Sequence, residues 1–281
     1  MQLGIGTYTY GWASGIFRNE SADAAARAGY RNLSAQDLID RALLLNVPLV
    51  QICVLPDLTS MNHTELVAVR QYAVAGGIGL EIGTKGSDPG HLLRFLEIAH
   101  MLDAHLVRTI FMEPSPGLVE ERRRIDQVAD RYADAGVMLA IENYETTSVL
   151  ELRSFVRDLD NVNIGVCLDT TNSLGRAEGV REVIEALMPF TKCLHVKDFR
   201  VVRHESNTAF TVLGVPAGHG LLDLPEQLRM LQAACPDASI VLEQWTPYQK
   251  NFVDTIRLEQ EWAAIGVGNL NLILAQVQGQ Q

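Results

Sequence analysis

The chain has 281 residues, of which 47% are hydrophobic and 20% are charged. This composition is ordinary for a globular protein, and the length fits one (β/α)8 barrel, which needs about 250 residues. The formal net charge of −11 argues against a nucleic-acid partner. The run Arg122-Arg123-Arg124 lies in an amphipathic helical pattern and is interpreted as a solvated helix face and not as a basic patch that binds phosphates.

The N-terminus, the apolar runs and the cysteines together predict a cytoplasmic protein. The first twelve residues, MQLGIGTYTYGW, lack the basic and apolar regions of a signal peptide. No apolar run is long enough to cross a membrane, so no membrane association is expected. The four cysteines form no CxxC pair, which argues against a structural zinc site and a disulfide framework.

Short apolar runs alternate with helical patterns along the whole chain, and no linker separates them. Several runs, such as VMLAI and NIGVCL, are almost wholly apolar, which is typical of strands buried on both faces. The alternation predicts βα units around a parallel sheet. The eight predicted strands are Leu3–Thr9, Leu49–Val54, Gly79–Gly83, His105–Met112, Val137–Asn143, Asn163–Asp169, Lys192–Lys197 and Ser239–Gln244.

Cap residues mark four of the helices between these strands. The stretch from Trp12 to Asn32 is too long for a simple loop, and we expect it to form a lid or a short extra helix over the barrel mouth. The four helix starts are Ser148 with Glu151, Asp223 with Glu226, Ser34 with Asp37, and Asp88 before Pro89.

The alternation fits either a closed barrel or a doubly wound open sheet. An open sheet usually carries a glycine-rich GxGxxG turn after its first strand, whereas this chain has GIGTYTYGW there. We therefore predict an α/β protein, a (β/α)8 TIM barrel that forms a single domain over residues 1–281.

Ionisable side chains lie at or near the ends of four consecutive predicted strands, where a barrel of this kind has its active site. Taken singly, each is better explained as a helix cap, a salt-bridge partner or a buried histidine. Taken together, three carboxylates and an imidazole would be costly to bury without a cation, so the set predicts a divalent metal site. The four residues are Glu142, Asp169, His195 and Glu243.

Five segments of the chain resemble the xylose-isomerase-like superfamily of TIM barrels. This superfamily contains sugar-phosphate isomerases and epimerases, D-tagatose 3-epimerase-like proteins and the AP endonuclease family 2. The resemblance covers nearly the whole chain and implies that the four residues hold one Mn²⁺, Mg²⁺, Co²⁺ or Zn²⁺ ion. It also implies that Glu142 and Glu243 act as acid and base. The segments are IENYE, VCLDTTNSLG, LHVKDF, VLEQW and PAGHGLLDLP.

The resemblance predicts an isomerase or epimerase that acts on a ketose or keto-sugar. The metal would stabilise an enediolate, and a glutamate would take the proton from the carbon beside the carbonyl. The residues do not show which glutamate is the base. One alternative is a lyase or dehydratase acting on a 3-keto-sugar, keto-glycoside or keto-cyclitol by the same proton abstraction. Another is a sugar-binding barrel without catalysis.

The chain departs from this family where relatives contact substrate. Some relatives have a histidine three residues after the metal-binding aspartate and an arginine six after the histidine ligand. Here these positions are Asn172 and Val201, and Arg200 or Arg203 could replace the arginine. These differences affect the choice of substrate and leave the metal ligands intact. Weaker candidates for substrate contact are Tyr8, Trp12, Asn172, Lys197 and Arg200.

Further contacts are expected inside and outside the barrel. Lys197 would alternatively form a salt bridge to Asp198 or another acid. Arg108 is expected to pair with Glu81, and Gln51 to face the pocket. The apolar run LNLILAQV at 270–277 would pack either on the barrel or on a partner. In the second case the protein would form a homo-oligomer. The expected partner is a small sugar or keto-sugar.

Overall fold

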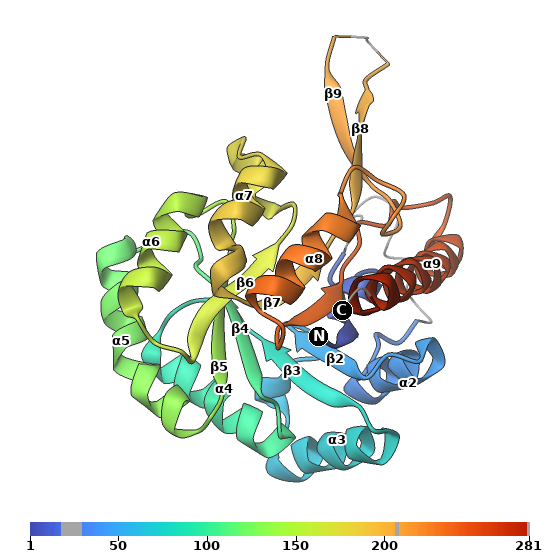
Figure 1. Cartoon of the computed structure of the whole chain (residues 1–281). Helices are drawn as coiled ribbons and strands as arrows, with labels where there is room; N and C mark the ends of the chain where they lie inside the picture. The colour runs from blue at the N-terminus through green and yellow to red at the C-terminus, as the bar shows by residue number, and fades with distance from the viewer. Residues whose placement is uncertain (18–29, 206–207, 280–281) are drawn as a thin grey trace.

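A computed structural model describes residues 1–17, 30–205 and 208–279 of the chain. Eight parallel strands close into a barrel, and helices surround it (Figure 1). Each strand pairs with the next along the chain, and β10 closes the ring between β7 and β1. The barrel strands are β1 (Leu3–Gly6), β2 (Leu49–Cys53), β3 (Gly79–Gly83), β4 (Leu106–Ile110), β5 (Met138–Glu142), β6 (Ile164–Asp169), β7 (Thr191–Val196) and β10 (Ser239–Leu242).

The predicted (β/α)8 barrel is therefore confirmed, and all eight predicted strands are present. The largest difference is at the first strand, which was expected to reach Thr9 but ends at Gly6. There the backbone turns into the 3-10 helix η1 (Thr7–Tyr10), because the Gly6 N–H donates to Oγ1 of Thr9 at 2.8 Å instead of to a neighbouring strand.

Helices follow the strands as the alternation predicted, and the four expected caps are confirmed. The side chains of Ser34, Asp88, Ser148 and Asp223 each accept a hydrogen bond from the backbone N–H three residues later. Such caps satisfy donors that a helix start leaves without partners. The helices are α2 (Ala35–Leu45), α3 (His63–Gly76), α4 (Pro89–Leu102), α5 (Leu118–Asp134), α6 (Val149–Leu159), α7 (Val180–Leu187), α8 (Leu224–Ala234) and α9 (Phe252–Gln278). Short 3-10 turns are η2 (Leu58–Ser60), η3 (Asn172–Arg176) and η4 (Met188–Phe190).

The C-terminal apolar run lies on α9. Leu270, Leu274 and Val277 are buried in the main core, so this run packs against the barrel and its helices. Leu272 points outward and is exposed. In the part of the chain that the structure describes, no helix has the length and apolarity to cross a membrane.

The interior of the barrel has an apolar layer and a polar layer. A small apolar cluster fills the half nearer the strand starts, and it contains Leu49, Leu106, Ala140, Cys167, Cys193 and Val241. Side chains two residues apart in a strand share a face, so the next inward residue lies closer to the strand ends. In all six strands that residue is polar and buried. The polar layer consists of Gln51, Arg108, Glu142, Asp169, His195 and Glu243.

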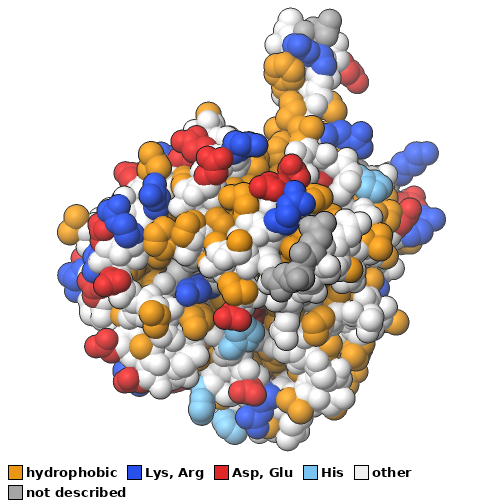
Figure 2. Space-filling model, viewed as in Figure 1, with side chains coloured by type: hydrophobic (Ala, Val, Ile, Leu, Met, Phe, Trp, Pro, Cys, Tyr) orange, Lys and Arg blue, Asp and Glu red, His pale blue; other side chains and the backbone are white. Residues whose placement is uncertain are grey.

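A hairpin that is not among the predicted strands follows β7. Strands β8 (Phe199–Arg203) and β9 (Phe210–Gly214) pair antiparallel and project away from the barrel (Figure 1). Figure 2 shows hydrophobic side chains along the projection, where Val201, Phe210, Val212 and Leu213 are exposed. Apart from Phe199, these exposed strands contribute no side chain to the barrel core that an apolar run would reveal. The predicted lid over 12–32 lies partly outside the described residues.

Candidate active site and metal centre

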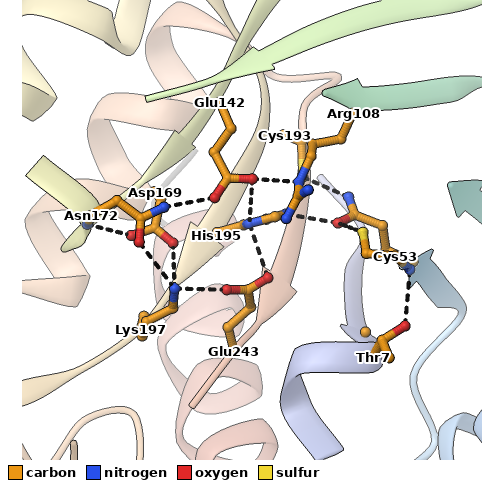
Figure 3. Close-up of polar contacts among 12 residues, drawn as sticks. Thr7, Cys53, Arg108, Glu142, Asp169, Asn172, Cys193, His195, Lys197 and Glu243 are labelled. Carbon is orange, nitrogen blue, oxygen red and sulfur yellow. Dashed lines mark hydrogen bonds and ion pairs between the residues drawn. The ribbon is translucent and has the colours of Figure 1, made fainter. Parts of the chain in front are cut away.

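The structure brings the four predicted ligand residues together at the C-terminal ends of the strands. Glu142 and Asp169 are the last residues of β5 and β6, His195 lies near the end of β7, and Glu243 directly follows β10. All four side chains are buried. Nδ1 of His195 lies 3.1 Å from Oε1 of Glu243 and 3.7 Å from Oε2 of Glu142, as Figure 3 shows.

Backbone and side-chain hydrogen bonds orient Asp169. Its Oδ1 accepts from the backbone N–H of Thr171 at 2.8 Å and of Asn172 at 2.9 Å. The side chain of Asn143 holds the Asp169 backbone by donating to its carbonyl at 3.0 Å and accepting from its N–H at 2.7 Å. Oδ2 of Asp169 is thereby turned toward the other ligand residues.

Two cationic side chains are buried among these carboxylates. Lys197 Nζ lies 2.8 Å from Oδ2 of Asp169 and 2.9 Å from Oε2 of Glu243. Arg108 Nε forms a close ion pair with Oε2 of Glu142. Burying a charge without a partner is costly, so the cations and the carboxylates stabilise one another in this position.

These contacts show that the expected partner of Arg108 was wrong, and they show which acids Lys197 contacts. Arg108 pairs with Glu142 and not with Glu81. Arg108 aligns with Gly83 on β3, two residues beyond Glu81, and its side chain meets the Glu142 carboxylate at the polar layer. Lys197 pairs with neighbouring acids and not with Asp198. The Asp198 carboxylate instead accepts backbone N–H groups from the loop that follows the hairpin, at Gly218, Gly220 and Leu222.

The buried charges shift the pKa values of the site. Burial alone would lower the pKa of His195, but interactions with Glu243 and Glu142, among others, outweigh it and raise this pKa to about 10. Burial would raise the pKa of Glu243, but the charges of His195 and Lys197 lower it to about 2. Burial raises the pKa of Glu142 against the opposing charge of Arg108. The two glutamates thus differ in how readily they take a proton.

The donor set fits a divalent ion. Oε2 of Glu142, Oδ2 of Asp169 and Nδ1 of His195 are buried and, apart from the ion pairs above, have no hydrogen-bond partner in the described chain. One ligand atom from each of these three residues lies within 4.8 Å of the other two. Carboxylate oxygen and imidazole nitrogen are ligands that Mn²⁺, Co²⁺ and Zn²⁺ accept.

A cavity opens above these residues. Of the weaker substrate candidates, Tyr8, Asn172 and Lys197 line it. Trp12 and Arg200 are not among its lining residues. The Trp12 indole N–H donates to the Thr246 carbonyl at 2.7 Å, and Arg200 is exposed on the projecting hairpin. Gln51, expected to face the pocket, lies instead below it, with its Oε1 at 2.8 Å from Nε2 of His195.

Several lining residues were not identified from the sequence. Lys85 follows β3 by two residues, and Arg108 lies within β4. Lys85 could have been found by examining the ends of all eight strands instead of the four with metal-ligand residues, whereas Arg108 was expected only as a partner of Glu81. The other such residues carry no charged side chain: Phe17, Ile110, Met112, Tyr144, Gln244 and Trp245.

Comparisons with known proteins agree with this architecture. The chain is 30% identical to the 3-oxo-isoapionate decarboxylase of Pectobacterium atrosepticum over 265 residues, which cover 93% of this chain and 92% of that protein. A D-psicose 3-epimerase from Clostridium cellulolyticum H10 has a TM-score of 0.71 at 15% identity, over 98% of this chain and 99% of that one. A magnesium-bound xylose isomerase-like TIM barrel protein from Mycobacterium smegmatis has a TM-score of 0.63 at 14% identity, over 85% and 91%. Residues 90–264 match the family model of xylose isomerase-like TIM barrels, and the chain belongs to that family.

Proposed function

We propose that this protein is a divalent-metal-dependent decarboxylase of a small 3-oxo sugar acid. The observation that carries the proposal is the pair of buried cations, Arg108 and Lys197, among the ligand carboxylates at the floor of the cavity. The decarboxylase relative, which matches over nearly the full length of both chains, supports the same reaction class.

The charge of the site suits an anionic substrate. With His195 neutral, as a metal ligand must be, the carboxylates of Glu142, Asp169 and Glu243 and the cations of Arg108 and Lys197 leave one net negative charge. A divalent ion held by the four ligand residues would make this charge positive and would supply Lewis-acid stabilisation to a substrate oxygen that gains charge. Lys85 adds a further positive charge where the cavity meets solvent. An acid that carries a keto group is therefore better matched than a neutral sugar.

The residues of the chain can then assist each step. When the bond between the α-carbon and the carboxyl group of a 3-oxo acid breaks, carbon dioxide leaves and the electron pair moves onto the keto oxygen. Lys197 lies where it can stabilise this developing negative charge. The carbon then needs a proton. Glu142 is the better candidate to take one up from water and pass it on, because burial raises its pKa, and it returns to the carboxylate form afterwards. Glu243, with a pKa near 2, remains a carboxylate.

A second candidate is the isomerase or epimerase that the resemblance predicted. It is favoured by the presence of two glutamates, Glu142 and Glu243, in one site. Each of them has a carboxylate oxygen near Nδ1 of His195. One carboxylate could take a proton from a substrate carbon and the other could return one, which is what epimerisation needs. Decarboxylation of a 3-oxo acid that has a hydroxyl on its α-carbon and epimerisation of a ketose would both pass through an enediolate, so one site could serve either reaction.

The test is to incubate Mn²⁺-loaded protein in D₂O with 3-oxo sugar acids, 3-oxo-isoapionate among them, and with ketoses. Carbon dioxide release with one deuterium in the product would support the decarboxylase. An exchanged or epimerised ketose without carbon dioxide would support the second candidate. Metal-loaded protein that converts nothing would favour the sugar-binding alternative. E142Q should abolish turnover, and E121Q, which changes a buried carboxylate on α5 outside the cavity, should not.

A further inference from the structure

A line of polar contacts runs from His195 through the barrel interior to the end opposite the cavity. Nε2 of His195 lies 2.8 Å from Oε1 of Gln51 on β2. The Gln51 Nε2 donates to Oε2 of Glu81 on β3 at 2.8 Å. Oε1 of Glu81 lies 3.2 Å from Nε2 of His105, which precedes β4 and has 54% of its side chain exposed.

The donors and acceptors along this line have only one consistent arrangement. An ionised carboxylate only accepts hydrogen bonds, so Glu81 requires the NH₂ group of Gln51 to face it. The amide oxygen of Gln51 must then face His195. Because that oxygen also only accepts, Nε2 of His195 must carry a proton. A neutral His195 ring therefore keeps its lone pair on Nδ1, the atom that faces Glu243 and Glu142.

Glu81 has no other evident role at this position. It is fully buried, and a buried carboxylate costs free energy unless it is paired. Neither of its oxygens reaches the cavity, whose lining does not include Glu81 or Gln51. An apolar pair at these registered positions of β2 and β3 would continue the apolar layer that begins at Leu49. The polar pair is thus better explained by what it does to His195.

We propose that Glu81, acting through Gln51, is a positioning residue that fixes the tautomer of His195 so that Nδ1 can bind the metal, and that His105 holds Glu81 from the opposite end of the barrel. Ring nitrogens that do not bind metal commonly donate to an oriented acceptor, and loss of such an acceptor typically weakens metal binding by about 10- to 100-fold. The hydrogen bond with Glu81 raises the pKa of His105, which favours a positively charged ring beside the carboxylate.

This inference depends on the metal site of the proposed function, so the test measures Mn²⁺ binding directly, by titration calorimetry on metal-free protein. E81Q and Q51L should weaken Mn²⁺ binding by about 10- to 100-fold. E81Q acts because an amide at position 81 can donate as well as accept, which lets the Gln51 amide turn over. The matched controls E121Q and Q227L, at buried positions on α5 and α8, should bind Mn²⁺ as the wild type does.

The double variant Q51E/E81Q distinguishes orientation from packing. It exchanges the two groups: the new carboxylate can accept from His195, and the new amide can donate to that carboxylate. We expect it to recover most of the Mn²⁺ affinity lost in E81Q. ¹⁵N NMR of the Zn²⁺-loaded wild type should show His195 protonated at Nε2. If E81Q does not fold, Q51L and Q51E/E81Q are compared instead. Q51L lacks an acceptor for Nε2 of His195 and Q51E/E81Q has one, so the double variant should bind Mn²⁺ more tightly.

The outcomes separate the two proposals. If the wild-type protein binds no Mn²⁺, the proposed metal site is wrong, and so is the proposed function that depends on it. Wild-type binding that E81Q and Q51L leave unchanged would overturn only the positioning role, as would a Zn²⁺-loaded His195 protonated at Nδ1. Failure of Q51E/E81Q to bind Mn²⁺ more tightly than E81Q would also count against it.

Discussion

Nζ of Lys197 lies 2.8 Å from Oδ2 of Asp169, the one carboxylate oxygen of that residue that accepts no backbone hydrogen bond. The same ammonium group reaches Glu243 at 2.9 Å. A cation is thus built into the set of residues that would hold the metal, and it contacts two of the four. We propose that Lys197 stabilises developing charge, whereas its two partners bind the metal.

Replacing Lys197 should reduce turnover without weakening metal binding. K197M removes a positive charge that competes for Asp169 and Glu243, so Mn²⁺ affinity should stay equal or increase. The kcat should fall by about 100- to 1,000-fold, the usual effect of losing one group that stabilises developing charge. Steady-state kinetics at saturating Mn²⁺ measures this. K85M, at the exposed edge of the cavity, is the control and should raise KM more than it lowers kcat. A normal kcat in K197M would contradict the assigned role.

Metal binding should release a proton. The pKa of about 10 makes His195 positively charged in metal-free protein at pH 7, whereas a ligand nitrogen must be neutral. Mn²⁺ affinity should therefore rise with pH, by up to about tenfold per pH unit below the pKa. Calorimetry in two buffers with different ionisation enthalpies counts the protons released, and about one per ion is expected at pH 7. Affinity that does not change between pH 6 and 8 would rule this out.

Removing Arg108 should destabilise the fold. R108M leaves the buried Glu142 without its ion-pair partner, which typically costs about 3–5 kcal/mol. The double variant R108M/E142M removes both charges and should recover much of that loss. Urea unfolding of metal-free protein measures the free energy of unfolding of each variant. If the double variant is less stable than R108M alone, the pair contributes through packing and not through charge.

Glu259 should stabilise the segment after η1. Its two carboxylate oxygens accept from the backbone N–H groups of Trp12 at 2.8 Å and Ala13 at 3.0 Å. E259Q retains one acceptor and presents an NH₂ group to the other donor, so unfolding free energy should drop by about 1–3 kcal/mol. Thermal denaturation, with the exposed E261Q as a control, tests this. A melting temperature equal to that of the wild type would show that these bonds contribute little.

The barrel could be predicted because its strands are buried on both faces and therefore appear as nearly continuous apolar runs. The ligand residues were identifiable because each interrupts such a run at or near the end of its strand. Contacts across the barrel could not be predicted. Gln51 and His195 are 144 positions apart, and only the closure of the barrel brings their side chains within 2.8 Å.

The wrong pairing of Arg108 has the same origin. Arg108 and Glu81 lie on adjacent strands, but which side chains meet also depends on the stagger between the strands, which the sequence does not show. In the structure, Arg108 aligns with Gly83 on β3 and with Ala140 on β5, and its side chain continues upward to Glu142. The hairpin β8–β9 was missed for a different reason, since its exposed alternating residues contribute nothing to the apolar pattern of the core.

We propose that Glu142, Asp169, His195 and Glu243 together hold one divalent ion on which turnover depends. The most direct test is to strip the protein with a chelator, add Mn²⁺ back in steps and follow carbon dioxide release from a 3-oxo sugar acid. The proposal predicts no release from stripped protein, a rate that saturates at one ion per chain, and no recovery in D169A. Full activity in the stripped protein, or recovery of D169A at the wild-type metal ratio, would contradict it.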